Sequence, residues 1–401
     1  MSVREKGRAV ALTARIAGHY LSERIGRSAT TARLGEVPAA PEALTPEWLT
    51  AVLCDGHPDA KVESVALTGG SDGTSSRRAI SVEYNEAGRS AGLPTELFSK
   101  STTSLTQRIV CGLCHLLENE SGFYTRIRPE LDMEAPVGYH AEFDPRSFRS
   151  LFLLENVVTT KGATFGNPLT RELDRAMAED MVGQLARYHG AFWDSPRLRT
   201  DFGWLLTGER WHTEIDNMIN TARMFRNGIA RGEAVIPPEL LKRRNELWPG
   251  LFRAMALHSN TPQTLVHADV HAGNWYRTAD GRMGLYDWQC TLRGNWALDF
   301  AYALMSGLTI ENRRAWEREL LEFYLDRLKA AGGDAPGFNE AWLHYRQQTF
   351  QGMFAWVGTL GQGRMQPDMQ PRDVSLANVE RIMQAIADLE SLDSLDESYS
   401  G

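Results

Sequence analysis

The sequence has no long apolar run. None of its 401 residues lies in a stretch approaching the 18 or more consecutive apolar residues of a membrane span. The apolar run at residues 9–14 stops at Arg15, which makes it too short for the core of a signal peptide. We therefore expect a cytoplasmic protein that does not use a membrane as a partner.

Cysteines are few, and no charge strongly dominates. Four cysteines in a chain of this length are poor evidence for a disulfide framework, so we expect them to be reduced. The 43 Lys and Arg residues against 51 Asp and Glu give a formal net charge of −8, which offers no broad electrostatic attraction to nucleic acid or anionic lipid. Nucleic acid is therefore not an expected partner.

Two of the cysteines stand in 111-CGLCH-115, which has the spacing of covalent c-type haem attachment. That chemistry requires export, and the N-terminus has no signal peptide. A lone C-x-x-C could also be half of a structural zinc site. Because the motif falls within a predicted helix, we interpret Cys111 and Cys114 as buried or half-buried helix residues.

The chain exceeds the usual size of one hydrophobic core, so two packed lobes are expected. Residues 1 to about 35 have a helical pattern, and the three prolines of 35–48 end it. Residue patterning next predicts strands, and later long helices. The predicted strands are 80–84, 95–100 and 151–157, and the predicted helices are 105–128, 173–193, 312–331 and 340–360. The fold class is therefore α+β, a small antiparallel sheet lobe followed by a larger helical lobe.

Residues 275–286 contain Asp280-Gly281, a dipeptide that favours a two-residue hairpin turn. With that turn, Asn274 and Asp287 fall opposite each other at the open end of the hairpin, roughly 5 Å apart. An amide oxygen and a carboxylate at that separation can share Mg²⁺ and leave room for phosphate oxygens. Asp269, on the loop entering the same end, could accept a proton from a hydroxyl nucleophile. This is an arrangement suited to phosphoryl transfer.

These residues carry a resemblance to a known family. The segments 267-HADVHAGN-274, 285-LYDWQ-289 and 298-LDFAYAL-304 resemble the aminoglycoside phosphotransferase and choline kinase superfamily. The Trp-Gln pair after Asp287, together with 185-LARYHGAFW-193, is most similar to its ecdysteroid-kinase-like branch and the bacterial relatives of that branch.

The resemblance implies a two-lobed protein-kinase-like fold that uses ATP and Mg²⁺ to phosphorylate a small-molecule hydroxyl. The expected parts are an N-terminal helical extension at 1–45, a β-rich nucleotide-binding lobe at 46–154, a hinge at 155–160, and a helical lobe with the catalytic loop and acceptor site at 161–401. ATP or GTP preference and the choice between monomer and homodimer stay open.

The resemblance also implies nucleotide contacts. Lys100, which ends a predicted strand, would pair with Glu120, whose helix position already places it on the apolar face. Adenine would bond backbone groups near Glu155 to Val157, where the apolar strand ends. The Gly-rich segment 68–77 would cover the phosphates through Ser71, Gly73 or Ser75 and neighbouring amides, although it lacks the protein-kinase glycine pattern.

Three further residues surround the catalytic segment. His271 could donate to the transferring phosphoryl oxygens or only order its own loop, and the sequence leaves both open. His267 is expected to support the loop by hydrogen bonding, without a catalytic role. Asp299 is expected to bond backbone amides and fix the loop.

Two rival functions remain open. His267, Asp269 and His271 alternate, so an extended chain could present all three to a metal in a metallohydrolase. That reading leaves Asn274 and Asp287 without a role. A nucleotide-binding pseudokinase is the other rival, and the intact set of Asp269, Asn274 and Asp287 argues against it.

The segment 340–373 would contribute to the acceptor wall, as the resemblance implies. It is poor in carboxylates, which a polycationic aminoglycoside would need as partners. Its acids and bases are Asp368, Asp373, Glu340, Arg346, Arg364 and Arg372, and its large apolar residues are Trp342, Tyr345, Phe350, Met353, Phe354 and Trp356. Some of the latter must be core, but the composition favours a largely apolar acceptor, steroid-like or macrolide-like, over an aminoglycoside, a sugar or choline.

Overall fold

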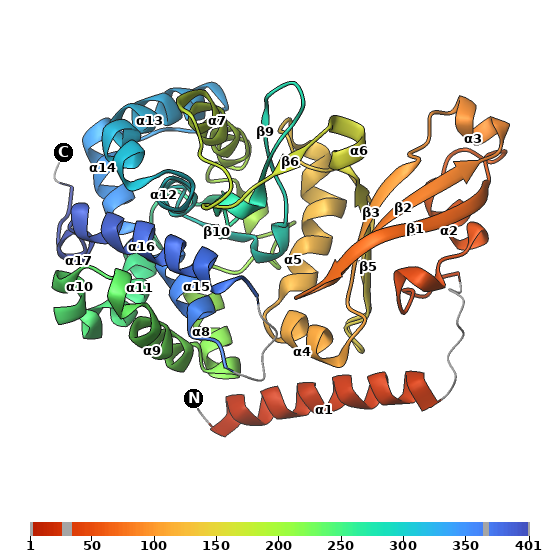
Figure 1. Cartoon of the computed structure of the whole chain (residues 1–401), viewed down its shortest axis with the longest axis horizontal. Coiled ribbons are helices and arrows are strands. Elements are labelled where there is room, and N and C mark those ends of the chain that lie inside the picture. Colours follow the sequence, from red (N-terminus) through yellow and green to blue (C-terminus); the bar gives the residue numbers. More distant parts are fainter. Residues whose placement is uncertain (1–2, 26–33, 364–368, 400–401) are drawn as a thin grey trace. The chain divides into compact units, whose positions relative to one another are not determined.

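The computed structural model describes residues 3–25, 34–363 and 369–399, which fall into two compact units (Figure 1). The first unit comprises the described residues up to 130 together with 136–163, and the second comprises 131–135 with the residues from 164 onward. The N-terminal residues predicted as an extension group with the first unit. The division after residue 163 lies just beyond the segment predicted as a hinge, 155–160.

The first unit is built on a five-stranded antiparallel sheet in the order β1-β2-β3-β5-β4. Its strands are β1 (Val62–Asp72), β2 (Ser76–Tyr84), β3 (Glu96–Ser101), β4 (Gly138–Phe143) and β5 (Ser150–Glu155). Alternate residues of a strand point to one face, so Ile80, Leu97 and Leu153 are all fully buried in one cluster with Trp48 and Leu49. The three strands predicted from the sequence lie in β2, β3 and β5.

Among its described residues, the first unit also contains the 23-residue helix α1 and several short helices. They are α1 (Val3–Ile25), α2 (Pro46–Leu53), α3 (Glu86–Ser90), α4 (Leu105–Leu113), α5 (Leu116–Gly122) and α6 (Val157–Lys161), with a π-helix at Phe123–Ile127 and 3-10 turns at Pro41–Ala43 and Arg128–Glu130. The single helix predicted over 105–128 is therefore wrong. The chain breaks between α4 and α5, because His115 adopts a left-handed backbone with φ 61°. Cys111 and Cys114 lie just before this break and are buried, and burial raises the pKa of Cys114 to about 12.

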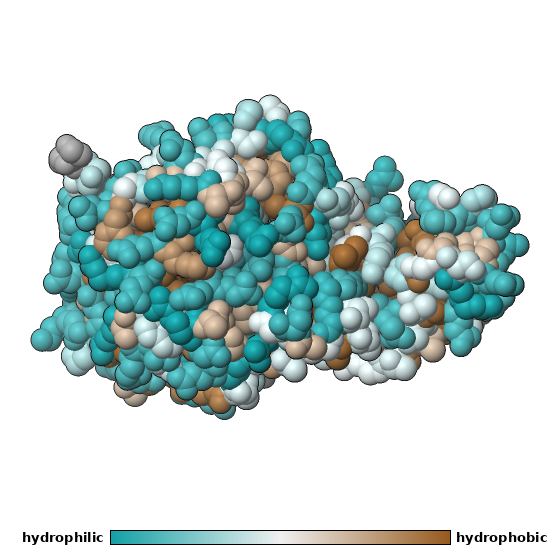
Figure 2. Space-filling view, turned by 90° about the horizontal axis from the view of Figure 1, so that it is seen from above, coloured by the Kyte–Doolittle hydropathy of each residue, from teal (hydrophilic) through white to brown (hydrophobic). Residues whose placement is uncertain are grey.

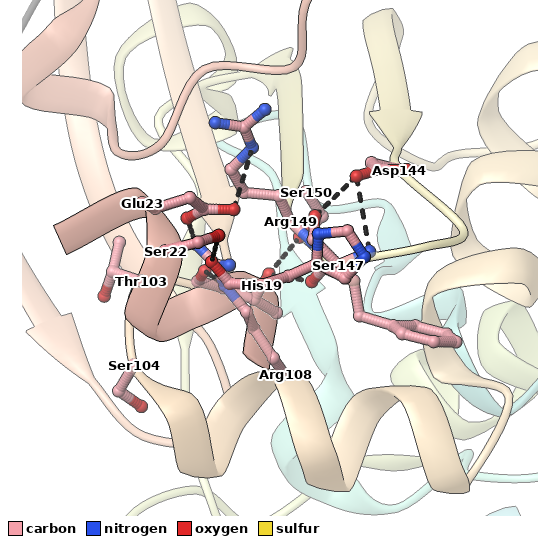
Figure 3. A network of polar contacts seen from close by, with 12 residues as sticks. His19, Ser22, Glu23, Thr103, Ser104, Arg108, Asp144, Ser147, Arg149 and Ser150 are labelled. Atoms are coloured by element: carbon pink, nitrogen blue, oxygen red, sulfur yellow. Dashed lines mark hydrogen bonds and ion pairs between the residues drawn. The ribbon is translucent and has the colours of Figure 1, made fainter. Parts of the chain in front are cut away.

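Helix α1 is attached to the first unit by a polar network (Figure 3). The carboxylate of Glu23 accepts a hydrogen bond from Arg108 Nη2 at 2.8 Å, and Arg149 Nε lies 3.9 Å from the same carboxylate. Arg108 is buried on α4, and its Nε donates to the carbonyl of Thr102, just beyond the end of β3. Helix α1 is thus bound through Glu23 to Arg108 of α4, the helix that follows β3.

The second unit is mainly helical, as the sequence predicts. Its helices are α7 (Arg175–Ala191), α8 (Gly208–Ile219), α9 (Thr221–Gly232), α10 (Pro238–Lys242), α11 (Arg244–Leu257), α12 (Ala297–Gly307), α13 (Ile310–Ala330), α14 (Phe338–Gln347), α15 (Phe350–Leu360), α16 (Arg372–Asp388) and α17 (Ser391–Ser394). The predicted helices 173–193 and 312–331 correspond to α7 and α13. The predicted helix 340–360 is two helices, since the backbone departs from α14 at Gln348 before α15 begins.

Short strands lie on either side of residues 267–274 in the sequence of the second unit. They are β6 (Thr164–Phe165), β7 (Thr264–Val266), β8 (Trp275–Arg277), β9 (Met283–Leu285) and β10 (Leu292–Gly294), with 3-10 turns at Ala272–Asn274 and Trp288–Cys290. Strand β7 pairs with β10, and β8 pairs with β6 and β9. The segment 131–135 joins this unit because Leu285 N donates to the carbonyl of Glu134 at 3.0 Å.

The hairpin of β8 and β9 differs by one residue from the predicted register. Trp275 pairs with Leu285, and Arg277 pairs with Met283. Thr278 N then donates to Arg282 O at 2.9 Å, which leaves a three-residue loop ending at Gly281 with φ 92°. The predicted two-residue turn is therefore wrong, because a three-residue loop with a left-handed glycine closes the hairpin.

The face shown in Figure 2 is largely hydrophilic, and its hydrophobic side chains gather in small separate areas. No helix among the described residues has both the length and the apolar character needed to cross a membrane.

Candidate active site

A buried aspartate fixes the loop that follows β7. The two carboxylate oxygens of Asp299, on α12, accept from the amides of His267 at 2.6 Å and Ala268 at 2.8 Å. Tyr188 also donates to this carboxylate, at 2.6 Å. Burial alone would raise the pKa of Asp299, but hydrogen bonding and charge interaction with His189 outweigh it and lower the pKa. Asp299 therefore has the loop-fixing contacts expected from the sequence.

Asp269 follows directly and is held from two sides. Its Oδ1 accepts from the hydroxyl of Tyr302 at 3.0 Å, and its Oδ2 lies 3.3 Å from Asn274 Nδ2. Burial raises the pKa of Tyr302 well above its ordinary value, so the phenol stays protonated and remains a donor. Because Tyr302 occupies Oδ1, Oδ2 is the oxygen better placed to take a hydrogen bond from a substrate hydroxyl.

His267 uses both ring nitrogens within the protein. Its Nδ1 accepts from Asp269 N at 3.1 Å, which makes Nε2 the donor to the carbonyl of Tyr286 at 3.0 Å. Burial lowers the pKa of His267, so the ring is neutral. A ring with both nitrogens engaged cannot also ligate a metal, and this excludes the metallohydrolase arrangement of His267, Asp269 and His271. It also gives His267 the supporting contacts that were expected.

His271 binds its own loop through Nδ1, and its Nε2 is directed toward the side of Asp269. Its Nδ1 accepts from Gly273 N at 2.9 Å, while Nε2 is 3.9 Å from Asp269 Oδ2. The ring meets the edge of Trp356, from α15, with centroids 5.1 Å apart. The loop-ordering role left open by the sequence is thus present, and Nε2 is the atom that could donate to a phosphoryl group.

Asn274 is oriented by its neighbours. Its Nδ2 donates to the carbonyl of Asp269 at 2.8 Å, which turns Oδ1 to the other side of the amide. Arg171 donates to the carbonyls of Ala272 and Trp275, at 3.3 and 2.8 Å, on either side of Asn274. The backbone and the amide of Asn274 are therefore both restrained, with an oxygen acceptor presented.

Asp287 is not directly opposite Asn274, contrary to prediction. Tyr286 N donates to Asn274 O at 3.1 Å, so Tyr286 occupies the opposing position and Asp287 follows it. In an extended strand this shift would turn Asp287 to the other face. Asp287 instead has a left-handed backbone with φ 67°, which breaks the alternation of the strand. Its side chain is buried, with 7% of the residue exposed.

The structure brings Lys100 and Glu120 together in the first unit. Lys100 Nζ, on β3, donates to both carboxylate oxygens of Glu120, on α5, at 2.6 and 2.8 Å. Both residues are buried, which makes this an unusual place for two charges. A buried, bidentate ion pair at the end of a strand restrains the lysine in one orientation.

The Gly-rich segment is a tight hairpin. Ser71 lies in β1 opposite Arg77, and only residues 73–75 form the tip. Gly73 N donates to Ser75 O at 3.1 Å, so this amide is already engaged, contrary to an open phosphate cradle. Ser75 Oγ is buried and has no hydrogen-bond partner among the described residues. Of the three predicted residues, Ser75 is therefore the one whose hydroxyl is available to a ligand.

The expected adenine segment has one amide suited to a ligand. Glu155 N donates to Val137 O at 2.8 Å, and Asn156 N donates to Glu96 O at 3.3 Å. Val157 begins α6, and the first amides of a helix have no partner within that helix. The side chain of Glu155 accepts from Val137 N and Thr160 Oγ1, so it orders this segment.

Much of the predicted acceptor wall is core. Tyr345, Phe350, Met353 and Trp356 are each at most 3% exposed, while Trp342 and Phe354 are only partly buried. Some of these residues were expected from the sequence to be core, and the structure assigns four of the six to it, because helices α14 and α15 turn these side chains into the unit. Arg364 and Asp368 lie outside the described residues.

Three residues that contact the segment 267–275 were not identified from the sequence. Tyr302 lies one helical turn after Asp299, a spacing that could have indicated its approach to the same loop. Gln351 Nε2 donates to Ala268 O at 2.9 Å, and Arg171 reaches Ala272 and Trp275. Neither of these two has a local sequence signal, since the contacts join segments 83 and 101 residues or more apart.

Comparison with solved structures finds similarity to kinases of small molecules. A microcompartment-associated aminopropanol kinase aligns with a TM-score of 0.51 and 14% identity, covering 85% of this chain and 95% of that one. A choline kinase from Streptococcus pneumoniae (0.46, 13%, 85% and 97%) and a spectinomycin phosphotransferase bound to ADP and spectinomycin (0.44, 13%, 86% and 97%) also match. The first of these likenesses shows the kinase-like fold.

No curated protein matches the sequence significantly. The family model described as "Phosphotransferase enzyme family" matches residues 116–337, more than half of the 401 residues. That range contains Glu120 and the whole segment from His267 to Asp299 that the sequence predicts to be catalytic. The chain therefore belongs to the phosphotransferase enzyme family and is a small-molecule kinase.

Proposed function

We propose that this enzyme transfers the γ-phosphate of Mg·ATP to a hydroxyl group of a small, largely apolar alcohol. The observation that carries the proposal is the restrained carboxylate of Asp269, with Tyr302 on Oδ1 and only the longer hydrogen bond from Asn274 Nδ2, at 3.3 Å, on Oδ2. A carboxylate oxygen accepts more than one hydrogen bond, so Oδ2 can also take that of a hydroxyl. Phosphoryl transfer has a loose transition state, so orienting the nucleophile matters more than strong proton abstraction. Asp269 would orient the acceptor hydroxyl and take its proton, and His271 Nε2 would donate to the phosphoryl oxygens.

The residues present fit a magnesium site. Asn274 presents Oδ1 and Asp287 a carboxylate, and hard oxygen ligands are those that Mg²⁺ prefers. Both residues are more than nine-tenths buried, and Arg171 restrains the backbone around Asn274. Bound Mg²⁺ would neutralise charge on the β- and γ-phosphates. Two protein oxygens suffice, because Mg²⁺ keeps waters and phosphate oxygens as further ligands.

Nucleotide binding is proposed for the first unit. Lys100, restrained by Glu120, would contact phosphate oxygens, and Val157 N would donate to the adenine. Ser75 Oγ would add a hydroxyl to the phosphates. From the sequence we still expect a cytoplasmic enzyme that resembles the ecdysteroid-kinase-like branch.

The acceptor class rests on the character of α15. This helix carries no charged residue over Phe350–Leu360, and its Trp356 lies edge-on to His271, two residues from Asp269. A polycationic acceptor would need several carboxylates to replace water around its ammonium groups. An apolar alcohol needs only apolar surface and one oriented hydroxyl, which favours a steroid-like or macrolide-like molecule.

The test is a Mg·ATP consumption screen over a panel of kanamycin-type aminoglycosides, choline, sugars and apolar alcohols, with products identified by mass spectrometry. We expect a phosphorylated apolar alcohol, which Asp269→Asn should form roughly 10²–10⁴-fold more slowly under the same conditions. Efficient turnover of an aminoglycoside with none of any apolar alcohol would overturn the acceptor class. ATP binding without turnover of any acceptor would favour the pseudokinase instead.

A further inference from the structure

The residue before the catalytic aspartate has an unfavourable backbone conformation. Ala268 is a buried alanine with φ 62°, in the left-handed region that L-residues rarely adopt. Such a conformation is strained for an alanine and persists only when its surroundings enforce it. Since Asp269 follows directly, relaxation of Ala268 would redirect the carboxylate of Asp269.

Both hydrogen-bonding groups of Ala268 are fixed by buried side chains. Its N–H donates to Asp299 Oδ1, on α12, at 2.8 Å. Its carbonyl accepts from Gln351 Nε2, on α15, at 2.9 Å, and Gln351 is only 2% exposed. Two helices thus hold opposite sides of one strained residue.

A histidine hydrogen-bonds the other end of the amide of Gln351. His212, on α8, is fully buried, and its Nε2 lies 2.8 Å from Gln351 Oε1. Burial lowers the pKa of His212 to about 4, so at neutral pH the ring is uncharged. The carbonyl of Ala268 can only accept, so Nε2 of Gln351 faces it and Oε1 faces His212, which makes His212 Nε2 the donor. The aromatic rings of Trp211 and Phe354 pack against His212 and restrict it further.

We propose that Gln351 is a positioning residue for phosphoryl transfer, which holds Ala268 in its left-handed conformation and thereby aims Asp269 at the acceptor hydroxyl. The inference rests on the proposed role of Asp269. It links α8 and α15 to the catalytic loop through one chain of hydrogen bonds, from His212 to Gln351 to Ala268. Neither His212 nor Gln351 would touch nucleotide or acceptor.

The chain contains a matched control for this arrangement. Gln347, at the end of α14, is also buried, with Oε1 3.0 Å from His258 Nε2 and Nε2 donating to the backbone carbonyls of Ser394, at 2.7 Å, and Glu397, at 3.2 Å. The chemistry of the two sites is the same, but Gln347 contacts the end of α17 and Gln351 contacts the catalytic loop. A purely structural role would give both glutamines the same consequences.

The experiment compares Gln351→Met with Gln347→Met in the full chain. Methionine nearly keeps the volume and removes the two side-chain hydrogen bonds of Gln351 and the three of Gln347. The measurements are Mg·ATP hydrolysis with water as the acceptor, nucleotide affinity by titration, thermal unfolding, and hydrogen exchange of peptides covering 266–275. Should either variant not fold, the Gln→Asn pair at the same positions, one methylene shorter, replaces it.

For Gln351→Met we expect turnover at least about tenfold below that of Gln347→Met, with nucleotide affinity unchanged within about twofold and similar losses of thermal stability. Faster exchange confined to 266–275 should appear only in Gln351→Met. Equal turnover and equal exchange in the two variants would overturn the inference. If Asp269→Asn hydrolyses Mg·ATP as fast as the unsubstituted enzyme, the proposed function itself fails, and the exchange data still report on the loop.

Discussion

Lys100 donates to both carboxylate oxygens of Glu120, at 2.6 and 2.8 Å, in the interior of the first unit. Lys100 lies near the end of the strand β3, and Glu120 lies in the last turn of the helix α5. Removing one partner of a buried pair leaves an uncompensated charge, whereas replacing both by apolar residues is often neutral for stability. This difference separates the structural contribution of the pair from its proposed contact with nucleotide.

We expect Lys100→Met to lower the free energy of unfolding by roughly 3–5 kcal/mol, because Glu120 is left buried and unpaired. The double variant Lys100→Met with Glu120→Leu should regain most of that stability. Neither variant should bind ATP, since both lack the cation for the phosphates. Chemical denaturation and ATP titration measure the two effects, and a double variant that binds ATP normally would refute the nucleotide role.

Asp269→Asn should reduce turnover by roughly 10²–10⁴-fold, the usual contribution of a positioned acid-base group. The amide can still accept from Tyr302 but cannot take the proton of a hydroxyl. Affinity for Mg·ATP should remain close to that of the unsubstituted enzyme. Steady-state kinetics with a separate nucleotide titration decide this, and near-normal turnover would remove Asp269 from the mechanism.

Asp287→Ala should abolish the part of ATP affinity that depends on Mg²⁺, and Asn274→Ala should weaken it, because each removes an oxygen from the cation. Titrations with ATP in the presence of Mg²⁺ and of EDTA measure that difference. Asp280→Ala is the control, since Asp280 is an exposed acid in the loop of the same hairpin. If Asp287→Ala and Asp280→Ala behave alike, Asp287 is not a metal ligand.

Glu23→Gln should lower the free energy of unfolding by about 1–3 kcal/mol, because the buried guanidinium of Arg108 loses its carboxylate (Figure 3). The control is Glu118→Gln. Glu118 is half exposed and lies 3.9 Å from His115, so its pair contributes little. Denaturation midpoints compare the two, and an equal effect would mean that α1 is only loosely attached.

Stability should decline in mild acid because of two adjoining histidines. The rings of His258 and His344 lie 4.4 Å apart, and burial lowers the pKa of His258 to about 3 and of His344 to about 4. Between about pH 6.5 and pH 4 the unfolded chain binds a proton at each histidine and the folded chain does not. The free energy of unfolding therefore falls by about 1.4 kcal/mol per pH unit for each.

His258→Gln should reduce that slope by the share of one histidine, while stability above pH 7 changes less. Denaturation curves at pH 7, 6 and 5 for both proteins measure it. A variant whose stability declines as steeply as that of the unsubstituted protein would show that His258 is charged in the folded state.

The hairpin at 275–285 illustrates how far local patterns can be followed. The Asp280-Gly281 pair marked the turn, and the hairpin forms there. The loop holds one residue more than predicted, because Thr278 bonds Arg282 and Gly281 takes the left-handed position. That single residue moved Tyr286 opposite Asn274. The position of the turn was readable from the sequence, whereas its length and the register depended on hydrogen bonds that several loop lengths could satisfy.

The sequence by itself determined that a strand-rich part precedes a helical part, the inward position of Glu120, and the spacing of Asp269, Asn274 and Asp287, because side-chain periodicity and short-range geometry act within a few residues. Only the tertiary structure decided what holds those groups. Tyr302, Gln351 and Arg171 reach the catalytic loop across 33, 83 and 101 residues of chain. Such contacts form when helices pack against one another, and each depends on the whole unit being folded, so no local pattern contains them.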